Sequence, residues 1–287
     1  MIHTISNNNY SAQISELGAE LKSFKNDKGF EFIWIGNPNI WSGTAPILFP
    51  FVGKLKNDKY IFNGKTYKMN KHGFVRKRSF EVLEKKESEI SFILRSDNET
   101  KDSYPFDFEL IVEFEINVGI LTVSYMVINK GNNQMYFTIG SHPAFKLETD
   151  NCELSDYYIE FEKNENLDCY LIDGGLLAKD TISHYMNNEN TIQLSKDIFN
   201  DDALVFKNIK SKQITIKNDI TGYKLKVMTG GAPHLGIWAI PAAPYVCIEP
   251  WYGFADNVGG SGELINKEGM IKLQSGENFI TGYQIIG

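Results

Sequence analysis

Short strand-like segments follow one another along this chain of 287 residues, and helical periodicity is weak throughout. Apolar and polar residues alternate in Phe108–Asn117 and again in Ile120–Asn129, on either side of Val118-Gly119. A period of two puts every second side chain on one face of a strand, and two such runs joined by a short connection indicate a β-hairpin. At least about fifteen strands and no helix longer than about two turns are expected, which predicts an all-β chain folded as a large antiparallel sandwich or barrel.

Two further hairpins are expected, one across Asn63-Gly64 and one at residues 81–94, where a charged turn joins two strands. Residues 235–240 and 245–249 are more continuously apolar, which is typical of central strands. Residues 195–199 are expected to form a short helical turn. The remaining strands are expected at residues 10–15, 19–24, 31–35, 213–217, 223–228, 270–273 and 279–286.

The chain shows no linker and no internal repeat. Its most polar region, residues 151–190, contains Asn187-Asn188-Glu189-Asn190 and is interpreted as long surface loops, not as a domain boundary. A length of 287 residues lies near the upper limit for one hydrophobic core, and 42% hydrophobic residues are enough to fill one. Residues 1–287 are therefore predicted to form a single domain.

Charge and hydropathy narrow the range of partners. The formal net charge is −7, and the basic residues are scattered apart from a modest patch at Lys71, Arg76, Lys77 and Arg78. No footprint for a phosphate backbone is present, so nucleic acid is not expected as a partner. The N-terminus lacks the apolar run of a signal peptide, and no stretch approaches the roughly 18 to 20 apolar residues of a membrane span. A cytoplasmic protein that is a monomer or a homodimer, with no membrane partner, is expected.

The three cysteines, Cys152, Cys169 and Cys247, are an odd number with no CxxC or Cys/His spacing. They are interpreted as free thiols in a reducing cytoplasm. A metal site formed by His72, His142 and Glu249 is conceivable, but no local ligand spacing supports it, so no metal is predicted.

Candidate proton carriers lie in three separated segments. His142 occurs in Gly140-Ser-His-Pro-Ala-Phe145, after an apolar strand, where Pro143 favours an extended backbone and Gly140 allows close approach of a ligand. Glu249 follows the apolar run 245–248, so burial should raise its pKa towards that of a general base. Structural alternatives are a buried histidine with satisfied partners and a carboxylate held in an ion pair.

Three other positions are candidates with weaker local support. His72, in Lys71-His-Gly-Phe74, could donate a hydrogen bond to a substrate or lock a loop. Lys54 ends an apolar segment punctuated by Pro and Gly that resembles a cleft wall. Asp201 or Asp202 could face a ligand, although acids at such turns are commonly N-caps.

Taken together, these segments resemble the aldose 1-epimerase (mutarotase) family, and more narrowly its LacX-type branch. The resemblance spans nearly the whole chain. It is carried by PILFPFVGKL at 46–55, KHGFVR at 71–76, GSHPAF at 140–145, DDALVF at 201–206 and CIEPWYGFAD at 247–256.

The resemblance implies a large antiparallel β-supersandwich with an open cleft, a small-molecule sugar as substrate, and no cofactor. It implies that Glu249 removes the proton of the C1 hydroxyl while His142 protonates the ring oxygen, so that the ring opens and recloses as the other anomer. It implies that His72 contacts the sugar near the ring oxygen and that Asp202, with Asp201 as the alternative, binds the sugar. If His142 acts as an acid near neutral pH, Glu249 is expected to help keep it protonated.

Two positions depart from the family pattern. Lys54 stands where family members commonly carry an arginine, which keeps the charge but loses the planar two-pronged donor. Arg76 resembles an arginine of the related sugar-phosphate epimerases and could contact substrate. A neutral hexose is preferred, with a hexose 6-phosphate 1-epimerase and a non-catalytic sugar-binding protein as alternatives. A glycoside hydrolase or lyase is less well supported, because hydrolysis usually needs two carboxylates and only Glu249 is convincing.

Overall fold

Strands dominate the computed structural model, which describes residues 1–150 and 152–287. Every pairing between its named strands is antiparallel. The predicted all-β antiparallel class is therefore confirmed. Within the described ranges, none of the helices is long and apolar enough to cross a membrane.

One sheet of fifteen strands forms most of the molecule. Thirteen of them follow one another in the order β4 (Ile47–Leu48), β12 (Ile139–Ser141), β20 (Tyr245–Tyr252), β19 (His234–Trp238), β16 (Leu204–Lys207), β14 (Tyr157–Asp173), β17 (Gln213–Asn218), β18 (Tyr223–Met228), β22 (Asn278–Ile286), β10 (Ile120–Asn129), β9 (Phe108–Asn117), β8 (Glu89–Arg95) and β7 (Glu81–Lys85). Two more strands attach to its side, β13 (Ala144–Lys146) to β20 and β15 (Leu176–Gln193) to β14.

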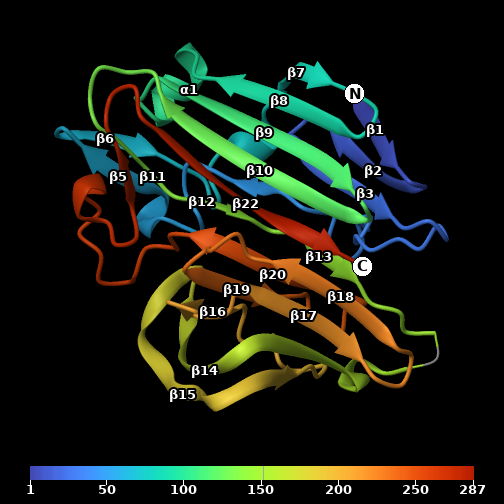
Figure 1. Cartoon of the computed structure of the whole chain (residues 1–287). Coiled ribbons are helices and arrows are strands. Elements are labelled where there is room, and N and C mark those ends of the chain that lie inside the picture. The colour runs from blue at the N-terminus through green and yellow to red at the C-terminus, as the bar shows by residue number, and fades with distance from the viewer. Residues whose placement is uncertain (151) are drawn as a thin grey trace.

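The large sheet divides into two groups of strands (Figure 1). Strands β7 to β10 lie together in the upper half of that view, and β14 to β20 occupy the lower half. Strand β22 joins the two groups, because it pairs with β10 along one edge and with β18 along the other.

Small sheets and short helices complete the fold. The sheets are β1 (Ile2–Asn7), β2 (Tyr10–Ser15) and β3 (Glu20–Lys25); β5 (Lys59–Phe62) with β6 (Lys65–Lys68); and β11 (Met135–Phe137) with β21 (Ile271–Leu273). The helices are α1 (Asn98–Ser103) and four 3-10 turns at Lys56–Asp58, Val75–Lys77, Leu154–Asp156 and Leu264–Asn266.

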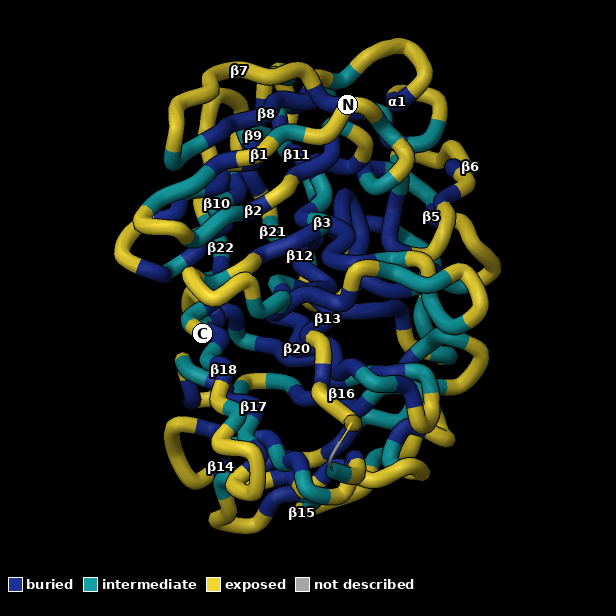
Figure 2. Tube along the Cα trace, turned by 90° about the vertical axis from the view of Figure 1, so that its right-hand side faces the viewer, coloured by how far each residue is buried: buried dark blue, intermediate teal, exposed yellow. Residues whose placement is uncertain are grey.

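Alternating burial explains why the hairpin predicted at residues 108–129 forms. In β9 the residues at even positions from Phe108 to Ile116 are buried, and β10 repeats the alternation from Leu121 to Asn129. Each large apolar side chain removed from water stabilises the fold by about 1.5–3 kcal/mol. Strand β20 is buried along almost its whole length and lies between β12 and β19, as its continuous apolar sequence predicted. Figure 2 shows this buried trace through the centre and the exposed edge strands β7 and β15 at opposite ends.

The interpretation of residues 151–190 as surface loops is wrong. Residue 151 lies outside the described residues, but the chain from Tyr157 to Gln193 forms the long hairpin of β14 and β15. Its register is interrupted at four places, and most side chains of β15 are exposed. A polar edge strand with irregular register carries little hydrophobic alternation, so the periodicity that reveals other strands is missing here.

Two smaller expectations also differ from the structure. Residues 31–35 form isolated bridges at Glu31 and Ile33 instead of a strand. Residues 196–200 form a turn and not a helix. Residues 31–35 lie between β3 and β4, which belong to different sheets, and residues 196–200 lie between β15 and β16 of the large sheet. In such connections tertiary contacts override local propensity.

Candidate active site

A cavity of about 300 Å³ is lined by residues of the neighbouring strands β16, β19 and β20 and by residues of connecting segments. Five of the six sequence-predicted site residues line it: Glu249, His142, His72, Asp202 and Arg76. The sixth, Lys54, lies at its outer opening together with both Asp201 and Asp202. The sequence motifs, which are distant along the chain, are thus brought to one cleft.

Glu249 projects from β20 into this cleft. It lies opposite Gly236 of β19 and is 1% exposed. Because side chains alternate along a strand, Tyr245, Cys247, Glu249 and Trp251 share one face of β20. The ring of Trp251 lies against Gly140 of β12, where an added Cβ would be 2.5 Å from the indole, so a larger residue would displace this wall of the cleft.

His142 follows β12, and its side chain lies directly beside that of Glu249 in the cleft. Its backbone N–H donates to the carbonyl of Pro46 at 3.1 Å, and its ring Nε2 lies 3.4 Å from Glu249 Oε2. Neither Glu249 Oε2 nor His142 Nδ1 has a hydrogen-bond partner among the described residues. Buried polar atoms without partners cost about 1–3 kcal/mol each, a cost that a polar ligand in the cleft would remove.

Burial shifts both groups towards their neutral forms. It raises the pKa of Glu249 well above 4.5, with Lys71 opposing the rise and Asp202 adding to it. It lowers the pKa of His142 from 6.5 to about 3. The raised pKa of Glu249 has the direction expected from the sequence, whereas the lowered pKa of His142 runs against the expectation that Glu249 helps keep this histidine protonated. The pair still carries one proton.

Aromatic rings enclose His142. Its ring stacks on Trp41 at 5.1 Å between centroids, and Trp238 meets it edge-on at 5.5 Å. The stack continues from Trp41 to Tyr245 at 5.6 Å and from Tyr245 to Trp34 at 5.0 Å. We call Trp41, His142, Trp238 and Glu249 the floor of the cleft. These side chains are packed closely together, so they have little freedom to move.

His72 lies on a tight turn beside His142, with their ring centroids 5.8 Å apart. Both His72 (φ 68°) and Gly73 (φ 72°) adopt the left-handed conformation, and a Cβ on Gly73 would lie 2.1 Å from the carbonyl oxygen of Phe49. The backbone N–H of Gly53 donates to His72 Nδ1 at 3.1 Å, so Nε2 is assigned the proton. Burial, with the nearby cations Lys71 and Arg76 adding to it, lowers the pKa of His72 well below 6.5, which favours a neutral donor at the cleft.

Asp202 is the better placed of the two candidate aspartates. It lines the inner cavity, whereas Asp201 reaches only the outer opening. Its φ of 78° is left-handed, and its Oδ1 accepts from the N–H of Ala203 at 2.8 Å. Non-glycine residues in this conformation are uncommon and cluster at functional sites, and both His72 and Asp202 belong to this class.

Lys54 and the tip of the β14–β15 hairpin form the outer opening. Lys54 Nζ donates to the carbonyl of Gly174 at 3.3 Å and lies 3.9 Å from Asp58. Leu177 anchors the hairpin, because its N–H donates to the carbonyl of Asp256 at 2.8 Å. We call Lys54, Asp58, Asp201, Asp202 and residues 172–175 the rim of the cleft.

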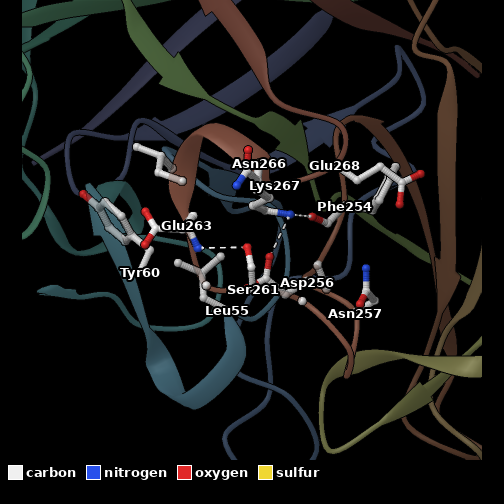
Figure 3. Close-up of a pocket in the computed structure, with 14 residues that line it drawn as sticks. Leu55, Tyr60, Phe254, Asp256, Asn257, Ser261, Glu263, Asn266, Lys267 and Glu268 are labelled. Carbon is white, nitrogen blue, oxygen red and sulfur yellow. Dashed lines mark hydrogen bonds and ion pairs between the residues drawn. The ribbon is translucent and has the colours of Figure 1, made fainter. Parts of the chain in front are cut away.

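A second cavity of about 60 Å³ shares Ala255 with the cleft, because this residue lines both. Figure 3 shows the residues that line the second cavity. There the buried Lys267 Nζ donates to the carbonyl of Phe254 at 2.6 Å and lies 3.4 Å from Asp256 Oδ1 (Figure 3). Asp256 also accepts from the N–H of Lys56 through Oδ2 at 3.0 Å. These bonds hold in place the wall of the cleft between the Lys54 segment and Ala255. The residues of the small cavity therefore support the structure of the cleft.

Several cleft residues were missed by sequence reasoning. Trp41 and Trp238 gave no signal, because an isolated tryptophan in an apolar segment is normally a core residue. The tip of the β14–β15 hairpin was missed because the hairpin itself was not predicted. The group of His142, Cys247 and Glu249 was also missed: their donor atoms lie within 4.8 Å of one another, although no local spacing connects His142 to the other two.

Comparisons with known proteins agree with the motifs. The family model described as aldose 1-epimerase matches residues 1–279. The plasmid and chromosomal forms of protein LacX from Lactococcus lactis subsp. lactis are each 30% identical over 284 residues, covering 94% of this chain and 93% of theirs.

Solved structures give the same result for the fold. A galactose mutarotase related enzyme from Lactobacillus acidophilus is 36% identical with a TM-score of 0.95, covering 100% of this chain and 97% of its own. A galactose mutarotase-like protein from Lactobacillus casei is 30% identical with a TM-score of 0.93, covering 100% and 99%. The resemblance read from the sequence and the supersandwich fold that it implied are both confirmed.

Proposed function

The chain belongs to the aldose 1-epimerase family, and from that premise we propose that it interconverts the α and β anomers of a neutral hexose. The family is one of sugar epimerases and mutarotases, so the class of reaction is an isomerisation of a sugar. The proposed reaction breaks and remakes the C1–O5 bond of one substrate molecule while two protons are exchanged with the protein, so an acid and a base are the groups that it requires.

The adjacency of His142 Nε2 and Glu249 Oε2, 3.4 Å apart in the floor, carries the proposal. The anomeric hydroxyl and the ring oxygen of a pyranose are attached to the same carbon, so an acid and a base that act on them must be close neighbours. The buried pair meets that requirement, and its Glu249 Oε2 and His142 Nδ1 have no hydrogen-bond partner among the described residues.

The proposed reaction is balanced in protons. Glu249, as the carboxylate, takes the proton of the C1 hydroxyl while His142, as the imidazolium, gives one to the ring oxygen. The C1–O5 bond breaks as the C1 carbonyl forms. Rotation about the C1–C2 bond and reclosure from the other face return both protons and give the other anomer. This reactive form holds the same single proton as the neutral pair of the empty cleft and differs from it by one transfer within the pair.

The remaining predicted residues have proposed binding roles. His72 presents its Nε2–H as a hydrogen-bond donor close to His142, which suits the ring oxygen region of the sugar. Asp202 and Lys54 are proposed to bind sugar hydroxyls at the rim. Arg76, whose guanidinium donates to the carbonyl of Lys71 at 3.1 Å and whose buried Nε has no partner among the described residues, is proposed to bind the same sugar.

The charge of the cleft favours a neutral sugar over a hexose 6-phosphate. Lys54, Lys71 and Arg76 are cations that could attract phosphate. Lys54 and Lys71 line the outer opening, which also contains the carboxylates of Asp58, Asp201 and Asp202, whereas Arg76 lines only the inner cavity. These acids offset the cations and would repel a phosphate dianion.

Polarimetry of freshly dissolved α-glucose and α-galactose tests the function. Wild-type protein should accelerate the change of optical rotation to equilibrium, and Glu249→Gln should lose about 10²–10⁴-fold in kcat because the base is gone. Glu165→Gln is the matched control: Glu165 is fully buried outside the cleft, and the amide oxygen can still accept from the Ser211 N–H. A wild-type protein that binds either sugar without accelerating its anomerisation would establish the non-catalytic alternative.

A further inference from the structure

A buried thiol that the proposed reaction does not use lies next to the Glu249–His142 pair, outside the set of residues that line the cleft. Cys247 is fully buried and precedes Glu249 by two residues on β20, so both side chains lie on one face of the strand. The sulfur of Cys247, a ring nitrogen of His142 and a carboxylate oxygen of Glu249 all lie within 4.8 Å of one another. Sulfur, nitrogen and oxygen donors therefore converge on one point.

The spacing of these donors is close to that of a tetrahedral metal site. Zinc bonds of about 2.0–2.3 Å in tetrahedral geometry separate neighbouring ligand atoms by roughly 3.3–3.8 Å. His142 Nε2 and Glu249 Oε2 already stand 3.4 Å apart. Since no pair exceeds 4.8 Å, closure onto a metal requires movements of about 1 Å, which side-chain rotation of Cys247 can supply.

An independent observation points to a ligand at the same place. Glu249 Oε2 has no hydrogen-bond partner among the described residues, and water cannot replace one easily because the side chain is only 2% exposed. A cation bound there would satisfy this oxygen. Because His142 and Glu249 line the cavity, the fourth coordination position would open towards it and could hold water or a sugar oxygen.

We propose that a thiophilic divalent cation of the zinc type binds His142, Cys247 and Glu249 and inhibits the protein. Binding forms one metal–sulfur, one metal–nitrogen and one metal–oxygen bond, and the protons of the thiol and of the Glu249–His142 pair pass to solvent. No electrons are transferred. The metal occupies the lone pairs that the acid and the base need, so it is an inhibitor and not a cofactor. Metal binding does not depend on the proposed reaction, whereas inhibition by the metal rests on the proposed function.

Cobalt(II) gives a readout of binding that needs no activity. We expect Co²⁺ to produce the visible bands of a tetrahedral site together with a near-ultraviolet thiolate-to-cobalt charge-transfer band. All titrations use a Cys152→Ser background, because Cys152 is partly exposed and could bind metal by itself. The charge-transfer band should disappear in Cys247→Ser and persist in Cys169→Ser, the matched control with another buried thiol.

Inhibition is then measured by polarimetry with Zn²⁺, again in the Cys152→Ser background. The Zn²⁺ concentration for half inhibition should rise at least about tenfold in Cys247→Ser and remain unchanged in Cys169→Ser, since even loss of an outer-shell partner typically costs 10–100-fold in affinity. Each variant is compared with its own metal-free rate. A charge-transfer band that survives in Cys247→Ser, or the absence of any such band, would overturn the metal site.

The two proposals fail in different ways. A protein without mutarotase activity that still shows the Cys247-dependent cobalt spectrum would overturn the proposed function and leave the metal site standing. An active protein that is inhibited equally in all variants would overturn the metal site and leave the proposed function standing.

Discussion

The floor and the rim of the cleft are built from different kinds of structure. Glu249 and His142 lie on and directly after central strands of the large sheet, with exposed fractions of 1% and 9%. At the rim, Lys54 keeps 31% of its side chain exposed and is held by the carbonyl of Gly174, at the tip of an edge hairpin. The floor is fixed by the sheet and by stacked rings, whereas the rim is held by a few bonds between loops.

This difference assigns different tasks to the two regions. An acid and a base must be positioned to a fraction of an ångström, and groups on rigid strands achieve this better than groups on loops. Recognition of hydroxyls that do not react tolerates more freedom. We therefore expect changes in the floor to alter kcat and changes at the rim to alter KM.

The largest expected effect comes from the floor. His142→Asn removes the proposed acid, so kcat for anomerisation should fall by about 10²–10⁴-fold, with sugar binding largely retained. Polarimetry measures the rate, and titration calorimetry measures binding. His234→Asn is the matched control, because His234 is equally buried but packs against Phe254, away from the Glu249–His142 pair. A His142→Asn protein with unchanged kcat would remove this residue from the mechanism.

A rim change should act on binding. Lys54→Met keeps the length of the side chain but removes the cation, and one lost hydrogen bond of about 1 kcal/mol corresponds to a rise in KM of roughly fivefold. We expect kcat to change little. Lys56→Met serves as the control, because Lys56 Nζ donates to the carbonyl of Gly260 on the side of the small second cavity. A large loss of kcat with unchanged KM would break the division between floor and rim.

The same division explains what the sequence predicted well. Floor residues lie in apolar, regularly alternating segments with short motifs such as GSHPAF and CIEPW, so the residues themselves suggest buried proton carriers. The pairing of His142 with Glu249 depends on β12 and β20 being neighbours, a long-range contact that local patterns do not contain. The family resemblance supplied that pairing, and the structure then brought the two residues together.

The rim was predicted less well for a physical reason. The hairpin of β14 and β15 is stabilised by its ladder and by the anchor at Leu177, and its polar outer strand has no alternation to detect. Trp41 was missed because only the three-dimensional stack with Tyr245 and His142 distinguishes it from an ordinary core tryptophan. The raised pKa of Glu249 was expected from its apolar strand, whereas the lowered pKa of His142 escaped prediction because it depends on the complete burial of that ring.

A smaller effect is expected at the aromatic side of the floor. Trp41 stacks on the His142 ring, and an aromatic face attracts a cation by about 0.5–1 kcal/mol, so it should favour the imidazolium form needed to protonate the sugar. Trp41→Leu should therefore lower kcat by about two- to fivefold. Trp41→Phe retains an aromatic face and should recover most of the rate. Equal losses in both variants would mean that the indole acts through packing alone.

The smallest expected effect concerns phosphate at the rim. Because the carboxylates of Asp58, Asp201 and Asp202 offset the cations of the outer opening, kcat/KM for glucose 6-phosphate should not exceed that for glucose and should be at most about fivefold lower. Polarimetry of both sugars at low and at moderate salt measures this ratio. Asp58→Asn removes one of the opposing charges, so it should raise the relative use of glucose 6-phosphate, and more so at low salt, where exposed charges are less screened. A wild-type preference for the phosphorylated sugar would show instead that Lys54 and Lys71 prevail over the acids and that the outer opening selects an anionic substrate.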